Sequence, residues 1–94
     1  MPAHVAVTIR VKDREKLSEY AAKAPDTVAK HGGKFMMRAP VAEVLSGNAH
    51  YNVFALIHFP DADTARGWYN SKEYQALIPV RDQGADMIFT LMEN

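Results

Sequence analysis

The clearest pattern in the chain is an alternation of apolar and polar residues, which is typical of β-strands with one buried face. It runs through residues 4–11 and 50–59, and we predict a strand in each. Residues 34–45 form another extended segment, and residues 87–92 are predicted to be the last strand. Pro40 lies in the middle of the second segment and cannot donate a ladder hydrogen bond. That strand is therefore expected at a sheet edge, with a bulge or bend.

Apolar residues at helical spacing predict a first helix between an N-cap at Asp13 and the pair Gly32-Gly33. The apolar face of this helix consists of Leu17, Tyr20, Ala21, Ala24 and Val28. Pro25 removes one helical hydrogen bond, so we expect a kink or a restart near Ala24. One of the two glycines is expected to take the left-handed conformation that ends many helices.

A second helical region follows the strand that ends at Phe59. Pro60 stops the strand, and Asp61 is expected to cap a helix whose apolar face carries Ala62, Ala65, Trp68 and Tyr69. Ser71 is expected to cap a second short helix beginning at residues 72–74. Ile78-Pro79 should end or kink that helix, leaving residues 80–84 as a connection with one more turn.

The predicted element order is β-α-β-β-α-β, which defines an α+β, ferredoxin-like plait over a single domain of residues 1–94. Right-handed crossovers give a four-stranded antiparallel sheet of order 4-1-3-2, with both helices on one face. The second strand is then at an edge, in agreement with the position of Pro40.

The two faces of this sheet have different compositions. The face expected under the helices carries Val5, Val7, Ile9, Val11, Val53, Ala55, Ile57 and Phe59. The opposite face has no covering element and carries His4, Ala6, Thr8, Arg10, Phe54, Leu56 and His58. Such a mixed apolar face is typical of an interface, so we expect a two-fold homodimer with the sheets face to face. His4 and His58 are expected to be cross-strand neighbours on this face.

The overall composition excludes several classes of protein. The 94 residues carry 11 basic and 11 acidic side chains, which argues against nucleic-acid binding. There is no cysteine and no paired histidine spacing, so no disulfide, metal site or cofactor is expected. We see no signal peptide and no apolar run long enough for a membrane, so a cytoplasmic protein is expected.

Several residues together resemble a bacterial family known as domain of unknown function 1330, in the dimeric α+β barrel superfamily. The resemblance covers nearly the whole chain and rests on Gly32-Gly33-Lys34, Phe59-Pro60, Ala65, Trp68-Tyr69-Asn70-Ser71, Tyr74 and Arg81. Two positions depart from the family: Ser46-Gly47 stands where Glu-Gly is common, and His58 stands where a carboxylate is common. The resemblance implies a ferredoxin-like fold and a dimer. The family has no agreed activity, although the superfamily includes cofactor-independent monooxygenases, haem-degrading enzymes and small dehydratases.

Two classes of function fit these residues. In the first, a small hydrophobic metabolite is bound or transformed in a pocket between the second helix and the sheet. Trp68 and Tyr74 would stack on it, while Tyr69, Ser71 and Arg81 would supply hydrogen bonds or charge, and His58 is a further candidate. In the second, the protein is a non-catalytic dimeric structural or interaction module, and the aromatic residues simply pack the helix on the sheet. A buried, dry Trp68 would favour the module.

Overall fold

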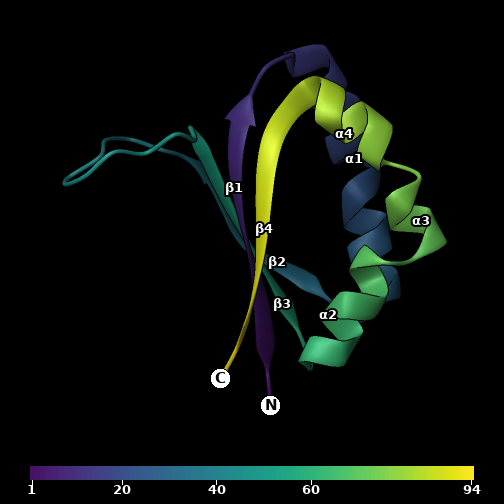
Figure 1. The fold of residues 1–94 in the computed structure, drawn as a ribbon. Helices are drawn as coiled ribbons and strands as arrows, with labels where there is room; N and C mark the ends of the chain where they lie inside the picture. The colour runs from purple at the N-terminus through teal and green to yellow at the C-terminus, as the bar shows by residue number, and fades with distance from the viewer.

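The computed structural model describes residues 1–94 and contains four strands and four helices (Figure 1). In chain order these are β1 (Ala3–Val11), α1 (Arg14–Lys30), β2 (Lys34–Pro40), β3 (Val53–Phe59), α2 (Ala62–Tyr69), α3 (Lys72–Gln75), α4 (Ile78–Gly84) and β4 (Ala85–Glu93). The strands form one antiparallel sheet of order β2-β3-β1-β4, and all the helices lie on one face (Figure 1). The predicted ferredoxin-like α+β fold and strand order are confirmed.

The sequence signals at the ends of α1 are realised in the structure. Asp13 Oδ1 accepts hydrogen bonds from the backbone N–H groups of Glu15 and Lys16, at 3.0 and 3.3 Å. At the other end, Gly32 has a φ of +74°, the left-handed conformation that glycine adopts at little cost. Pro25 lies inside an unbroken helix, so the chain does not restart there. Pro25 removes one backbone hydrogen bond, and the remaining hydrogen bonds of α1 keep the helix continuous.

The caps of the second helical region also follow the prediction. Asp61 Oδ1 accepts from the Thr64 N–H at 2.7 Å and begins α2. Ser71 Oγ accepts from the Tyr74 N–H at 3.2 Å and donates to the Trp68 carbonyl at 2.7 Å, which joins α2 to α3. Each cap depends only on residues within three or four positions, so the local sequence suffices to predict it.

The role predicted for Ile78-Pro79 was wrong. Pro79 lies in the first turn of α4, so it begins a helix instead of ending one. Proline suits this position because its fixed φ is helical and the first N–H groups of a helix have no intrahelical partner. Residues 80–84, expected as a connection with one more turn, are therefore the body of α4.

The connection between β2 and β3 is longer than the four residues left between the predicted extended segments 34–45 and 50–59. β2 ends at Pro40, β3 begins at Val53, and the residues between them form a loop that leaves the sheet on the side away from the helices (Figure 1). The edge position of β2 is confirmed, but its irregularity lies between Phe35 and Met37 and not at Pro40. Pro40 ends the strand because it lacks the N–H needed to continue the ladder.

The two sheet faces divide as the alternation predicts. Val5, Val7, Ile9, Ala55, Ile57 and Phe59 are buried beneath the helices, while Val11 and Val53 at the rim are partly buried. In the register of β1 and β3, Val7 lies opposite Ala55 and His4 lies opposite His58. The opposite face has no covering element in the chain.

Candidate functional site

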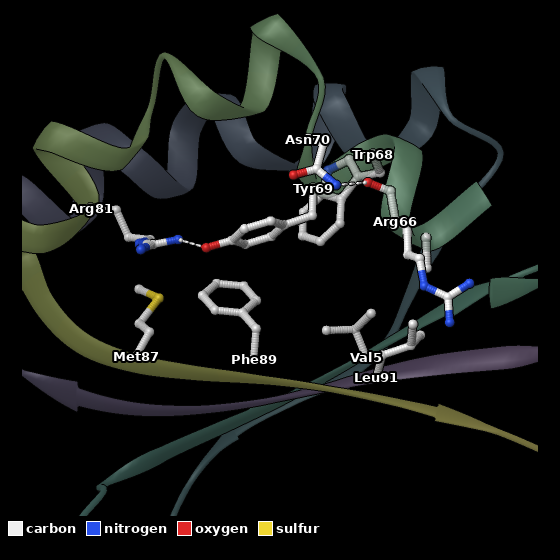
Figure 2. A pocket seen from close by; sticks show the side chains of 10 residues that line it. Val5, Arg66, Trp68, Tyr69, Asn70, Arg81, Met87, Phe89 and Leu91 are labelled. Atoms are coloured by element: carbon white, nitrogen blue, oxygen red, sulfur yellow. Dashed lines mark hydrogen bonds between the residues drawn. The ribbon is translucent and has the colours of Figure 1, made fainter. Parts of the chain in front are cut away.

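A cavity of about 370 Å³ lies between α2 and β4, on the helical side of the sheet (Figure 2). Its lining is formed by Val5, Ala65, Arg66, Trp68, Tyr69, Asn70, Arg81, Met87, Phe89 and Leu91. Aromatic and aliphatic side chains make up most of this wall, and no carboxylate contributes to it. The cavity therefore combines an apolar interior with a small number of hydrogen-bond donors.

Arg81 is the dominant polar group of this cavity. Its Nη1 donates to the hydroxyl oxygen of Tyr69 at 3.1 Å (Figure 2). The same Nη1 donates to the Tyr74 hydroxyl oxygen at 3.2 Å, and Nε donates to Asp82 Oδ1 at 3.1 Å. The guanidinium carbon lies 5.0 Å from the centre of the Phe89 ring, a cation–π distance. The other terminal nitrogen, Nη2, has no hydrogen-bond partner in the chain. Only 9% of Arg81 is exposed, and every fully buried side-chain nitrogen or oxygen of the chain has a hydrogen-bond partner. Nη2 is therefore the accessible part of the guanidinium, and it retains its donor capacity.

Behind Arg81, two tyrosines share a hydrogen bond in the core. The Tyr20 and Tyr74 hydroxyl oxygens lie 2.7 Å apart, and their rings meet edge to face. Burial raises the pKa of Tyr20 far above that of a free tyrosine, and it also raises the pKa of Tyr74. Burial opposes the charge of Arg81, but its hydrogen bonds to Tyr69 and Tyr74 outweigh this and raise its pKa. The cluster therefore keeps one positive charge and neutral buried phenols.

Trp68 is anchored in the core beside the cavity. It is 1% exposed, and its ring lies 4.5 Å from that of Tyr74 and 5.4 Å from that of Phe59, measured between centroids. Its Nε1–H donates to Thr27 Oγ1 at 3.0 Å, and the Thr27 hydroxyl donates to the Ala24 carbonyl at 2.7 Å. The indole is thus fixed in position with its only polar group satisfied, and one part of its ring faces the cavity.

The structure distributes the predicted ligand-binding residues over four places. Trp68, Tyr69 and Arg81 line the cavity together. Tyr74 is fully buried behind them, where it holds Arg81, and Ser71 is occupied as a helix cap. His58 lies on the opposite face of the sheet, because the alternation along β3 turns its side chain away from the helices. The structure therefore does not bring His58 to this cavity.

The sequence analysis missed the contribution of β4. Met87, Phe89 and Leu91 form the sheet side of the cavity, and their partners in β1 are Ile9, Val7 and Val5. Alternation along the last strand could have placed these three on the helical face. Thr27 was also missed, although a threonine on the apolar face of a helix is a signal for a buried hydrogen bond.

The uncovered face of the sheet gathers the predicted interface residues. From β1 and β3 it carries His4, Ala6, Thr8, Arg10, Phe54, Leu56 and His58. By register the edge strands add Lys34, Met37, Ala39, Asp86, Ile88, Thr90 and Met92. His58 Nδ1 lies 3.3 Å from His4 Nε2, with the ring centroids 5.1 Å apart, so the expected cross-strand neighbourhood is confirmed. Several large apolar side chains of this face, including Met37, Ile88 and Met92, are about half exposed in the single chain.

No three side chains of histidine, aspartate or glutamate gather closely enough to hold a metal ion. None of the helices has the length and apolar content that crossing a bilayer requires.

The fold and these surfaces define the class: a ferredoxin-like α+β protein with helices on one face of its sheet and an open opposite face. Solved structures of similar shape belong to this class. A protein of unknown function from Rhodopseudomonas palustris superposes with a TM-score of 0.84 at 15% identity, over 99% of this chain and 82% of that one. A dimeric ferredoxin-like protein of unknown function from Jannaschia sp. CCS1 has a TM-score of 0.80 at 12% identity, over 100% of both chains.

A third similar structure is SnoaB, a cofactor-independent oxygenase from Streptomyces nogalater. It has a TM-score of 0.69 at 13% identity, over 99% of this chain and 92% of that one. At this identity the likeness concerns the fold alone. No curated protein matches the sequence. Residues 2–94 match the family described as domain of unknown function 1330, and the chain belongs to that family.

Proposed function

We propose that this protein is a homodimer that binds a small, mostly apolar molecule in the cavity between α2 and β4. In this proposal Arg81 donates a hydrogen bond to an oxygen of the ligand. The observation that carries the proposal is the buried Arg81, whose Nη2 has no partner while its other donors are held by Tyr69, Tyr74 and Asp82. A guanidinium in this state is well suited to a carboxylate, an enolate or a carbonyl oxygen.

The size of the cavity supports a compact ligand. At about 30 Å³ for each non-hydrogen atom, 370 Å³ accommodates roughly 12 such atoms. Small-molecule sites are usually apolar and contain a few well-placed polar groups, and the mostly apolar wall with the two arginines Arg66 and Arg81 fits that description. The rings of Tyr69 and Phe89 pack against each other with centroids 5.5 Å apart and form part of the apolar wall.

The open sheet face supports the homodimer. Its centre consists of Ala6, Phe54 and Leu56, and the exposed Ile88 and Met92 extend it across β4. A contiguous apolar surface of this kind is unfavourable in water, and a second copy of the same sheet would cover it. Dimeric ferredoxin-like proteins are among the structures of similar shape.

Ligand binding can be tested by native mass spectrometry of protein purified from the producing cell. The expected result is a co-purified molecule of roughly 12 non-hydrogen atoms with the wild type and a reduced amount with Arg81→Gln. Lys72→Gln is the matched control, because Lys72 is exposed on α3 and forms no ion pair. A wild-type protein that carries no small molecule, and that fails to bind any member of a metabolite panel, would refute the proposal.

The dimer can be tested by sedimentation at micromolar concentration. Leu56→Asp should yield a monomer or an unfolded chain because it puts an unpaired charge into the interface. Ala22→Asp, on the exposed side of α1, should leave the dimer intact. Wild-type protein that sediments as a monomer under these conditions would contradict the dimer.

The second candidate is a non-catalytic dimeric structural or interaction module. The burial of Trp68 and the satisfaction of its N–H by Thr27 favour this reading for Trp68 itself. The two candidates differ in the cavity. The module predicts that Arg81→Gln changes stability without changing the occupancy of any ligand, whereas the binding protein predicts that occupancy falls.

A further inference from the structure

A second hollow lies on the same side of the sheet, between α1 and the strands β2 and β3. It has a volume of about 280 Å³, and its lining is formed by Val7, Ile9, Leu17, Tyr20, Ala21, Ala24, Pro25, Phe35, Arg38, Ala55, Ile57, Trp68, Met87 and Phe89. Trp68, Met87 and Phe89 also line the first cavity, so these three side chains form the partition between the two spaces.

The hollow exists because small side chains of α1 face an edge strand that has little cover. Ala21, Ala24 and Pro25 are short and leave a gap above the sheet. Across this gap Phe35 is 39% exposed, although its position opposite Ile57 places it on the helical face. An apolar space of this kind is poorly hydrated, so the binding of an apolar molecule in it is favourable.

A more polar hollow of about 540 Å³ adjoins the apolar one and opens to the surface. The two share Leu17, Ala21 and Arg38, and the polar hollow is also lined by Val11, Arg14, Ser18, Pro40, Asn52 and Val53. No acidic side chain lines either hollow. The salt bridges of the chain involve Lys12, Lys16, Arg66 and Arg81 and include neither Arg14 nor Arg38. The entrance to the apolar space therefore carries two arginines without an ion-pair partner.

We propose that these adjoining hollows form a second ligand site, which takes a small amphiphile with an apolar body and an oxyanion head group. The apolar body lies between α1 and the sheet, and the head group lies between Arg14 and Arg38. The charge of the entrance selects the head group, because a guanidinium forms charge-assisted hydrogen bonds with carboxylate or phosphate oxygens. At about 30 Å³ for each atom, the inner space holds roughly nine non-hydrogen atoms, which matches an eight-carbon chain.

The test uses three probes of one chain length: octanoate, octyl phosphate and octanol. Calorimetry with the intact protein should give tighter binding for one or both of the anions than for octanol, by at least tenfold. The double variant Arg14→Gln/Arg38→Gln should weaken binding of the preferred anion at least tenfold and leave the affinity for octanol unchanged. Whichever anion binds more tightly identifies the head group as a carboxylate or a phosphate.

The location is tested separately, with a variant that fills the apolar space. Ala21→Leu should weaken all three probes, whereas Ala22→Leu and Lys23→Gln, on exposed positions of the same helix, should not. In NMR spectra the methyl signals of Leu17, Ala21 and Ala24 should shift on addition of the preferred anion. Circular dichroism checks that each variant is folded, and the exposed arginines can be replaced without disturbing the core.

Three results would overturn the inference. Equal binding of octanol and both anions would show that the entrance does not recognise a head group. No binding of any probe would show that the hollow is not a site. Binding of an anion that is lost in Arg81→Gln but kept in Arg14→Gln/Arg38→Gln would place the ligand in the first cavity. That last outcome would leave the proposed function standing, so the two proposals fail separately.

Discussion

Gly84 should be one of the positions least tolerant of substitution, although it lies far from the centre of the sheet. It is the last residue of α4, and its carbonyl accepts hydrogen bonds from the N–H groups of Lys12 and Asp13, at 2.8 and 3.0 Å. A Cβ at this position would lie 2.5 Å from the backbone nitrogen of Leu17 and 2.8 Å from its Cα. Because these obstacles are backbone atoms, α1 and α4 would have to move apart.

The expected magnitude follows from two opposing effects. Overpacking of a well-packed region costs about 1–3 kcal/mol. The change from glycine to alanine by itself stabilises the folded state by about 0.5–1 kcal/mol, since alanine loses less backbone entropy on folding. Gly84→Ala should therefore lower the free energy of unfolding by about 1–2 kcal/mol. For a domain of this size that is a fall in Tm of about 5–15 °C.

Gly67 provides the matched control. It lies inside α2, and a Cβ there would meet no atom within 4 Å. Gly67→Ala should therefore raise the Tm by about 2–6 °C, from helix propensity alone. Thermal unfolding of both variants, at the same protein concentration as the wild type, checks the prediction. If Gly84→Ala is as stable as the wild type, the close contact of α4 with α1 is not a constraint on the fold. Because α4 also carries Arg81, Gly84→Ala should weaken ligand binding as well.

Three further outcomes are expected. Tyr20 is neutral in the fold and its pKa is raised, so its contribution to stability is present below the unfolded value of 10.0 and is lost as the pH rises above it. Urea unfolding between pH 9 and 11 should therefore show a steep loss of stability that Tyr20→Phe reduces. The pKa of Asp61 is lowered by its hydrogen bond from Thr64, so its contribution is present above 3.8 and is lost as the pH falls through the lower folded value. Asp61→Asn keeps a cap but cannot titrate, and it should flatten the loss of stability in acid. A chelator should leave the Tm unchanged, and a fall of several degrees would show that a metal contributes to folding.

The features predicted correctly from the sequence depend on neighbours along the chain or on a strict alternation. Asp13, Asp61 and Ser71 cap helices through amides two or three residues away, so no distant contact is needed. The period of two assigns each side chain of β1 and β3 to a face once the strand is recognised. The pairing of His4 with His58 followed from the antiparallel order together with that parity.

The features that were missed depend on contacts between residues far apart in the sequence. Pro79 stops a helix or starts one according to where the following residues lie, and here they close against α1, which turns residues 78–84 into α4. The ends of the two hairpin strands were also predicted wrongly: β2 ends at Pro40 and not at residue 45, and β3 begins at Val53 and not at residue 50. Which residues pair at the end of a hairpin depends on the register of the two strands.

The candidate site also depends on contacts between residues that are far apart in the sequence. The sequence analysis identified Trp68, Tyr69 and Arg81 as residues of interest but could not say which of the aromatic side chains would border a cavity. Tyr74 lies in the core, where its hydroxyl shares a hydrogen bond with the hydroxyl of Tyr20, 54 positions away in the sequence. Local sequence determines the type of most elements, such as β1, α1, β3 and α2, because backbone hydrogen bonds and side-chain alternation act over a few residues. Only the tertiary structure decides where the helices leave space above the sheet, because a cavity is the volume that side chains from several distant segments fail to fill.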